Sequence, residues 1–206
     1  SMKTGTKEPG DCGSELARDP GRGLRGHASL RLRRWSATGI AYFVTFWPAG
    51  RRKALTVPPL MDFECERDAM ETDGVWRVRA WVIKPDHVHL LMALGSMLPL
   101  ARAIARFKGK TAKALRAAAL AGQSGYFEHR PRTIDELRPI LYYLLMNPVR
   151  AGLSERGEAW SGFYRCGEDW AWFGDYAREA VTEPGWLARA DRDASKLAPT
   201  AEENRA

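Results

Sequence analysis

Residues 75–94 constrain the fold of this 206-residue chain more than any other segment. Residues 75–83 read V-W-R-V-R-A-W-V-I, residues 87–94 read H-V-H-L-L-M-A-L, and a K-P-D turn separates the two runs. Short runs of β-branched, aromatic and other apolar residues on either side of a turn are typical of paired antiparallel strands. We therefore expect a β-hairpin, around which the remaining elements must pack.

Other segments predict two more strands and two helices. Residues 39–47 are aromatic and β-branched and end at P-A-G, which predicts a buried first strand. Residues 58–73 open with two prolines followed by carboxylates, a pattern typical of a helix N-terminus. Residues 98–121 carry apolar residues at near-helical spacing and predict a second helix. The short aromatic run 125–132 contains a proline, so it predicts an edge strand.

A third helix should begin at the T-I-D-E sequence of residues 133–136, which matches a capping box. It should end near Met146, because Asn147 precedes Pro148 and is disfavoured in the α region. The order strand, helix, strand, strand, helix, strand is the split βαβ arrangement. We therefore expect an α+β, ferredoxin-like or RRM-like fold: an antiparallel sheet with two helices on one face and an additional C-terminal helix.

Composition indicates which class of partner the protein binds and where its folded domain begins and ends. The chain has 32 Lys plus Arg against 25 Asp plus Glu, a net charge of +7, which favours nucleic acid over an anionic membrane surface. Its three cysteines are widely spaced without a C-x-x-C pair, and no apolar run is long enough to cross a bilayer, so we expect a cytoplasmic protein. Residues 1–36 predict a flexible basic arm, residues 37–186 a single domain, and residues 187–206 a tail.

The H-V-H sequence of residues 87–89 is the sharpest chemical signal. Side chains alternate along a strand, so His87 and His89 should lie on one face and make half of a divalent metal site. The alternative is a surface strand with two hydrogen-bonded histidines. A third ligand and a reactive group nearby are needed to favour the metal site.

The predicted third helix offers both groups. Tyr143 and Asn147 are four residues apart and therefore share one helix face. An Asn carbonyl oxygen suits a metal site, and a phenol beside a Lewis acid is a candidate nucleophile. Tyr142 competes with Tyr143 for that role, since one of the two must be a core aromatic, and spacing alone does not choose between them.

Blocks of sequence in this order resemble a known family over about residues 33–165. They read Y-F-V-T-F, A-W-V-I-K-P-D-H-V-H-L-L, G-Y-F-E-H-R and L-Y-Y-L-L-M-N-P-V-R-A-G-L. They are similar to the single-tyrosine HUH transposases and, within them, the REP-associated tyrosine transposases. The resemblance implies that His87 and His89 bind a divalent metal, Mg²⁺ or Mn²⁺, and that Tyr143 is the catalytic nucleophile. It implies Asn147 as the third ligand, where better-known relatives use Gln.

The resemblance implies a metal-dependent single-stranded DNA endonuclease and strand transferase that acts through a 5′-phosphotyrosine intermediate at hairpin-forming repeats. It also implies a bacterial, nucleoid-associated location and no nucleotide cofactor. Relatives include swapped dimers, but we expect a monomer, because the C-terminal aromatic segment would hold the tyrosine helix in place. The alternative function is a non-catalytic single-stranded nucleic-acid-binding module of the same fold, and a third is a hydrolase that releases a free 5′-phosphate.

Basic residues outside this site are candidates for DNA contact. Residues 98–127 contain six Lys or Arg and no acid, which favours phosphate contacts, although a solvated helix face is the alternative. Arginines of the arm would enter a minor groove, unless the arm is only a solubilising tail. The candidates are Arg102, Arg106, Lys108, Lys110, Lys113, Arg116, Arg33 and Arg34.

Two aromatic features remain open in the sequence. His129, within the G-Y-F-E-H-R block, is a candidate for phosphate contact or proton transfer, and a hydrogen-bonded edge histidine is the alternative. The aromatic residues near the C-terminus either stack on unpaired bases or dock this segment on the core. They are Trp170, Trp172, Phe173 and Trp186.

Overall fold

The computed structural model describes residues 36–46, 48–49, 57–118, 121–122, 125–174, 177, 182–188 and 190. All of them belong to the unit that begins at Trp35. Residues 1–35 of the predicted N-terminal arm, with Arg33 and Arg34, lie outside the described residues, as does the predicted tail beyond residue 190.

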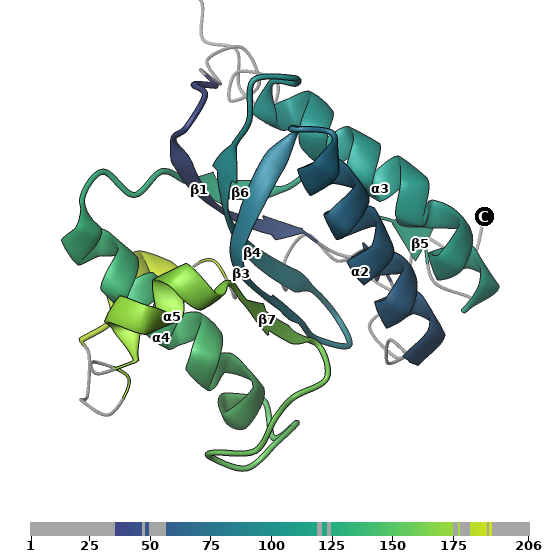
Figure 1. Ribbon diagram of the computed structural model, residues 1–206. Coiled ribbons are helices and arrows are strands. Elements are labelled where there is room, and N and C mark those ends of the chain that lie inside the picture. Colours follow the sequence, from purple (N-terminus) through teal and green to yellow (C-terminus); the bar gives the residue numbers. More distant parts are fainter. Residues whose placement is uncertain are drawn as a thin grey trace, which may run out of the picture. The chain divides into compact units, whose positions relative to one another are not determined.

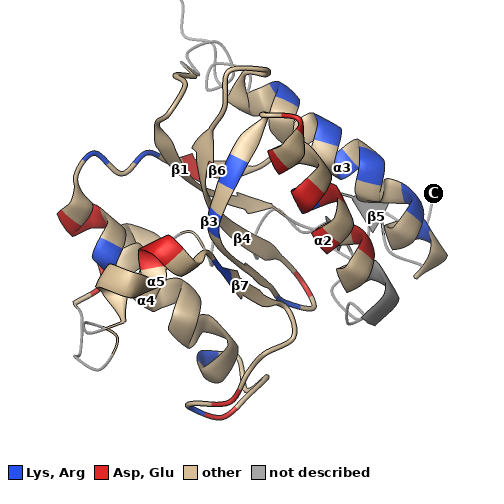
Figure 2. Ribbon diagram, viewed as in Figure 1, with Lys and Arg blue, Asp and Glu red and all other residues tan. Residues whose placement is uncertain are grey.

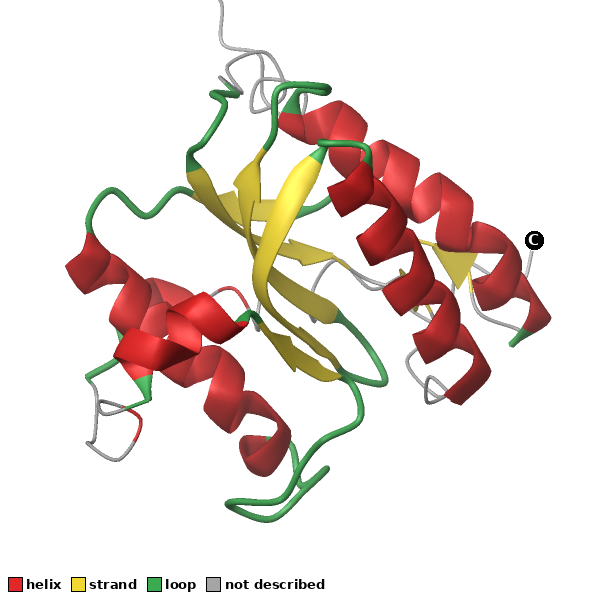
Figure 3. Ribbon diagram, in the orientation of Figure 1, coloured by secondary structure: helices red, strands yellow, loops and turns green. Residues whose placement is uncertain are grey.

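A five-stranded antiparallel sheet forms the centre of this unit, with the strand order β6-β1-β4-β3-β7 (Figures 1 and 3). The first four strands in this order are the predicted ones, in the order of the split βαβ fold. The fifth, β7, extends the sheet at the β3 edge and was not predicted. The strands are β1 (Ala41–Phe46), β3 (Trp76–Ile83), β4 (Val88–Leu94), β6 (Phe127–His129) and β7 (Phe163–Arg165).

Helices cover both faces of the sheet (Figure 1). The predicted pair, α2 (Val57–Thr72) and α3 (Leu100–Ala117), packs on one face. The predicted third helix, α4 (Ile134–Arg150), packs on the other face together with the short helix α5 (Gly167–Phe173). The sheet therefore separates two apolar cores, which we call the α2/α3 core and the α4 core.

Strand alternation sends neighbouring side chains into different cores. In β1, Tyr42 packs in the α2/α3 core and Phe43 in the α4 core. In β3 the alternation changes phase, because the pairing with β4 shifts at a bulge between Val78 and Ala80. As a result Val78 and Trp81, three positions apart, both face the α2/α3 core.

The start of α4 confirms half of the predicted capping box. Thr133 is the N-cap, and its hydroxyl accepts a hydrogen bond from the Glu136 N–H at 3.3 Å. The Glu136 carboxylate accepts from the Arg132 N–H at 2.9 Å instead of reaching back to Thr133. The N-terminus of α4 is thus fixed by its local sequence, one short connection after β6.

The end of α4 was predicted wrongly. The helix continues through Pro148 to Arg150, although the sequence predicted an end near Met146. The end is set by Gly152, whose φ of +67° favours glycine and whose N–H donates to the Val149 carbonyl at 3.0 Å. Asn147 therefore remains inside the helix, one turn after Tyr143.

Two further differences concern short elements. The helix predicted over residues 98–121 is α3, which ends at Ala117. A two-stranded sheet that was not predicted pairs β2 (Pro48–Ala49) with β5 (Ala121–Gly122). Within the described ranges, no helix has both the length and the apolar composition to cross a membrane.

Candidate active site

The two histidines converge on one point beside β4. His89 lies in β4, whereas His87 lies one residue before it, because β4 begins later than predicted. Both side chains are buried, with 4% of His87 and none of His89 exposed. Their Nε2 atoms are 2.8 Å apart. The H-V-H motif therefore brings two imidazoles together, as its spacing predicted.

The remaining ring nitrogen of each histidine is held by a neighbouring oxygen. His87 Nδ1 lies 2.9 Å from the Asp86 carboxylate, and His89 Nδ1 lies 2.8 Å from the Thr45 hydroxyl of β1. Burial alone would raise the pKa of Asp86, but the hydrogen bond and charge of His87 outweigh it and lower that pKa. These contacts fix both rings so that the Nε2 atoms face each other.

Tyr143 extends from α4 through the α4 core and contacts His89. Its hydroxyl is 3.1 Å from His89 Nε2, and its ring meets the His89 ring edge to face, with centroids 5.2 Å apart. The Tyr143 side chain is buried, with 3% exposed. Tyr142, the competing candidate, packs in the same core. The geometry thus brings the hydroxyl of Tyr143 to the histidines.

Phe43 of β1 packs against both His89 and Tyr143. Its ring stacks on His89 with a centroid distance of 5.6 Å, and it meets Tyr143 edge to face at 6.1 Å. The three rings belong to three different elements that meet in the α4 core. The position of His89 therefore depends on the register of β1 against β4, in which Thr45 is opposite His89.

Asn147 is the fourth residue predicted for the site. It is buried, with 3% of the residue exposed, and lies on α4 one turn after Tyr143. Among the residues that the structure describes, no group of three or more His, Cys, Asp or Glu side chains is arranged to hold a metal ion.

His129 lies at the β6 edge and stacks on Trp186 of the C-terminal segment, with centroids 3.7 Å apart. Its Nε2 is 3.7 Å from the Glu136 carboxylate, and burial lowers the pKa of His129 although Glu136 opposes that shift. In the sheet register His129 is opposite Phe43, which separates it from the histidine pair. The structure thus places His129 near the histidine pair, with Phe43 between His129 and His89.

The C-terminal aromatic residues pack on the α4 core. Phe173 is buried there, and Trp170, Trp172 and Trp186 are partly buried against it. Leu187 and Ala190 are fully buried in the same core. The packed part of the chain therefore continues beyond Trp186, where the sequence predicted its end.

The basic residues of α3 lie on the opposite face of the sheet from Tyr143 (Figure 2). Arg106 is engaged by Asp73 and by Glu66, the latter at 3.8 Å. Lys108 donates to the Gly125 carbonyl, and burial lowers its pKa to about 8. The other four predicted contacts are exposed: Arg102, Lys110, Lys113 and Arg116.

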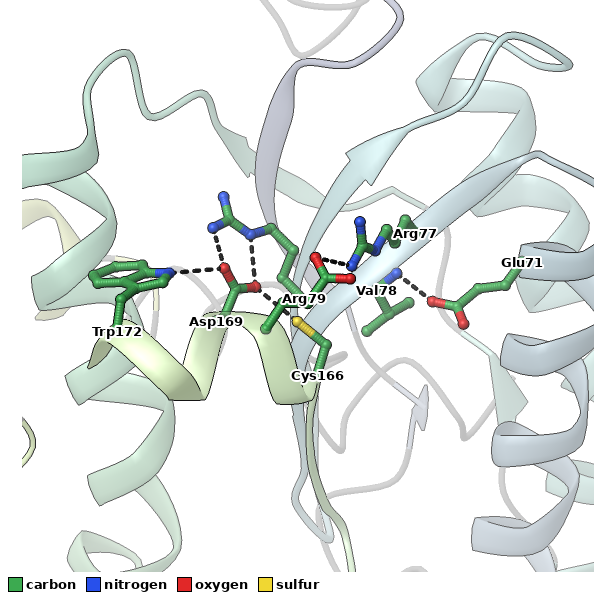
Figure 4. A network of polar contacts seen from close by, with 8 residues as sticks. Glu71, Arg77, Val78, Arg79, Cys166, Asp169 and Trp172 are labelled. Carbon is green, nitrogen blue, oxygen red and sulfur yellow. Dashed lines mark hydrogen bonds and ion pairs between the residues drawn. The ribbon is translucent and has the colours of Figure 1, made fainter. Parts of the chain in front are cut away.

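Sequence reasoning missed the residues that support the site. Asp86 directly precedes the H-V-H motif, so a search for acids beside the histidines would have found it. Thr45 has no such signal, because its role depends on the pairing of β1 with β4. The polar network that joins β3 to α5, centred on Arg79 and Asp169, was also missed (Figure 4).

Comparison with known proteins agrees with this fold. Residues 36–128 match the family model described as "Transposase IS200 like", a match that spans both histidines and ends before α4. No curated protein matches the chain.

Two solved structures are similar. One is described as the structure of the "REP associates tyrosine transposase bound to a REP hairpin", with a TM-score of 0.56 and 21% identity over 73% of this chain and 87% of that chain. The other is a putative transposase from Deinococcus radiodurans R1, with a TM-score of 0.40 and 15% identity over 61% of this chain and 95% of that chain. The first likeness shows a shared fold, and residues 36–128 are similar to the IS200-like transposase family.

Proposed function

We propose that this protein is a metal-dependent endonuclease and strand transferase for single-stranded DNA, in which Tyr143 forms a 5′-phosphotyrosine intermediate. The observation that carries the proposal is the convergence of three atoms. The Tyr143 hydroxyl is 3.1 Å from His89 Nε2, which is 2.8 Å from His87 Nε2. A hydrogen-bonded histidine pair serving only the core would not require a tyrosine hydroxyl at the same point.

The donor set suits a divalent metal such as Mg²⁺ or Mn²⁺. Both Nε2 atoms face one point, and both rings are oriented through Nδ1 by Asp86 and Thr45. Asn147 would add an amide oxygen as the third protein ligand, leaving positions for phosphate oxygens. When bound, the cation would polarise the scissile phosphate and neutralise charge on its non-bridging oxygens.

The residues of the chain would then position and carry out the substitution at phosphorus. The Tyr143 oxygen forms a bond to phosphorus as the bond from phosphorus to the 3′-oxygen breaks. The phenol loses one proton and the leaving 3′-oxygen gains one, so the products are a 5′-phosphotyrosyl protein and a free 3′-hydroxyl. Because the tyrosyl ester keeps the energy of the phosphodiester, a 3′-hydroxyl from another strand reverses the step and joins the strands without ATP.

The substrate we propose is single-stranded DNA with a hairpin. The support is the family of residues 36–128 together with the shared fold of a protein whose structure was solved with a REP hairpin. The exposed cations of α3 lie across the sheet from Tyr143, so they would hold DNA phosphates away from the cleaved bond. Such a protein would act at the bacterial nucleoid.

A denaturing gel tests the proposal directly. The purified protein is incubated with labelled single-stranded hairpin DNAs in Mg²⁺, Mn²⁺ or EDTA, beside Tyr143→Phe and the matched control Tyr142→Phe. We expect a metal-dependent covalent adduct that Tyr143→Phe abolishes and Tyr142→Phe retains.

Other outcomes would identify another function. Salt-sensitive binding without an adduct on any hairpin in a broad library would support the non-catalytic binding module. Cleavage that releases a free 5′-phosphate without a protein link would support a hydrolase. An adduct that survives in both tyrosine variants would contradict the role given to Tyr143.

A further inference from the structure

One glycine of α3 is not explained by the packing of the domain. Gly109 lies near the middle of α3 and is exposed. A Cβ added to it would meet no heavy atom of the described residues within 4 Å, and its φ lies outside the left-handed region. By contrast, a Cβ on Gly162 would lie 2.5 Å from the Ile83 carbonyl oxygen, and Gly152 has a φ of +67°. Glycine inside a helix is less stable than alanine, so the fold alone would favour another residue at position 109.

Gly109 is the central member of a cationic stripe along α3. Residues spaced alternately four and three positions apart lie on one face of a helix. In the series that runs through Gly109, the other four members from residue 102 to residue 116 are all cationic: Arg102, Arg106, Lys113 and Arg116. The first and last of them lie seven residues to either side of Gly109, about 10 Å along the helix axis, which is the rise of about three phosphates on one strand of a duplex. We call these five residues the α3 stripe.

The exposed positions of α3 carry only small or cationic side chains. They are Ala101, Arg102, Ala105, Gly109, Lys110, Lys113, Arg116 and Ala117. Proteins that hold unpaired bases stack them on aromatic side chains, and none of these exposed positions of α3 carries one. A duplex keeps its bases stacked inside and turns its phosphates outward, so this face of α3 suits a duplex and not a single strand.

The neighbouring helix α2 limits where a duplex can lie (Figure 2). α2 exposes Asp62 and Asp68, and the exposed Asp73 directly follows the helix. Glu66 and Asp73 both contact Arg106 of the α3 stripe. Carboxylates repel phosphates, so the duplex is confined to a track along α3 and does not spread over both helices.

We propose that the α3 stripe binds the duplex stem of a hairpin DNA, and that the sugar–phosphate backbone of the stem makes its closest approach at Gly109. The inference rests on the proposed function for the identity of the substrate, a hairpin DNA. The missing side chain at Gly109 lets one strand of the stem contact the backbone of α3, while the cations on either side bind the phosphates that precede and follow this point. Contacts of this kind fix the position of the stem without reading its sequence. Gly109 thus favours DNA binding although it lowers the stability of the helix.

Side chains added at Gly109 test the contact, because folding and binding should change in opposite directions. Gly109→Ala, Gly109→Gln and Gly109→Lys each introduce a better helix former, so each variant should unfold at higher urea than the wild type. Binding is measured by fluorescence anisotropy of a labelled hairpin in EDTA. We expect the affinity to fall about threefold for Gly109→Ala and about tenfold or more for the two larger side chains. Gly167→Ala is the matched control and should bind as the wild type does, because Gly167 of α5 is also exposed and its added Cβ would also meet no described atom within 4 Å.

Gly109→Lys separates close approach from simple charge. If α3 attracted DNA only through its positive charge, one more Lys would raise the affinity and steepen the slope of log affinity against log salt by about 1. We expect a lower affinity despite the added charge, and a loss confined to DNA with a paired stem, judged against an oligonucleotide of the same length that cannot pair. Gly109→Lys or Gly109→Gln binding the hairpin as tightly as the wild type would overturn the inference, as would a wild type that binds no hairpin.

The binding assay is independent of the chemistry at Tyr143. If no hairpin gives a covalent adduct but the Gly109 variants lose affinity as expected, the proposed function fails and the stem contact is supported. If the wild type forms the adduct and the Gly109 variants bind as it does, the proposed function is supported and the stem contact is refuted.

Discussion

Replacing Thr45 tests whether the orientation of His89 matters for the proposed chemistry. The Thr45 hydroxyl and the His89 ring are both fully buried, and 2.8 Å separates the hydroxyl from Nδ1. Thr45→Val keeps the shape and β-propensity of the residue but removes the hydroxyl, so Nδ1 loses this partner. Thr45→Ser keeps the hydroxyl and loses one methyl group.

Both substitutions should destabilise the fold by similar amounts, for different reasons. Leaving a buried polar group without its partner costs about 1–3 kcal/mol, and removing a buried methyl group costs about 1 kcal/mol. Stability therefore does not separate the two variants, but function should. Removing a group that orients a metal-binding histidine typically lowers metal affinity or activity about 10- to 100-fold.

The assay combines urea unfolding with the metal dependence of adduct formation. We expect both variants to unfold at lower urea than the wild type, and only Thr45→Val to lose adduct at a given Mn²⁺ concentration. Equal activity of Thr45→Val and Thr45→Ser would refute the reasoning, because His89 would then need no partner at Nδ1. Equal loss in both would also refute it, since the methyl packing and not the hydroxyl would matter.

Three further predictions address other residues. Asp86→Asn keeps an oxygen beside His87 but removes the charge, and should lower adduct formation about tenfold at limiting metal, measured by metal titration. Burial alone would raise the pKa of Asp169, but the hydrogen bonds from Arg79 and Cys166 outweigh burial and lower that pKa. The ionised Asp169 therefore stabilises the fold above the pKa of the unfolded state, and this stabilisation is lost as the pH falls through the pKa of the folded state. The difference in unfolding free energy between wild type and Asp169→Asn should therefore be full at pH 7 and shrink below about pH 4, measured by urea unfolding at each pH. Lys113→Gln should weaken DNA binding and reduce the slope of log affinity against log salt by about 1, measured by fluorescence anisotropy, whereas Arg106→Gln, already engaged by acids, should change the slope less.

The sheet and its main helices were predictable because their signals are local. The hairpin of β3 and β4, the aromatic β1 and the cap of α4 at Thr133 each appear within a short window of sequence. The sequence mispredicts the end of α4 because a proline is typical of a helix end, whereas the helix continues through Pro148 and ends before Gly152. Strand β7 has only three residues, too few to show an alternating pattern, and it pairs with residues 80–82 of β3, which are distant in the sequence. Local patterns could not have revealed it.

The residues of the candidate site also divide into those that the sequence predicts and those that it does not. His87, His89 and Tyr143 follow from motifs with fixed spacing, and the structure brings all three together. The resemblance to a known family chose Tyr143 over Tyr142, a choice that spacing alone left open. Thr45 was invisible in the sequence because its contact exists only in the register that sets it opposite His89. Slipping that register by one residue would turn His89 to the other face of the sheet.

The bulge in β3 changes which face each side chain of the strand occupies and also anchors α5. A regular strand would send Val78 and Ala80 to the same face, yet Val78 packs in the α2/α3 core and Ala80 in the α4 core. The extra residue is Arg79, whose guanidinium binds Asp169, while the Val78 N–H donates to Glu71 of α2 (Figure 4). The bulge is thus held from both layers. The arginine that interrupts an apolar strand in the sequence is therefore explained by the helix that it anchors, and the same bulge that sets the two cores also positions α5 over the tyrosine helix.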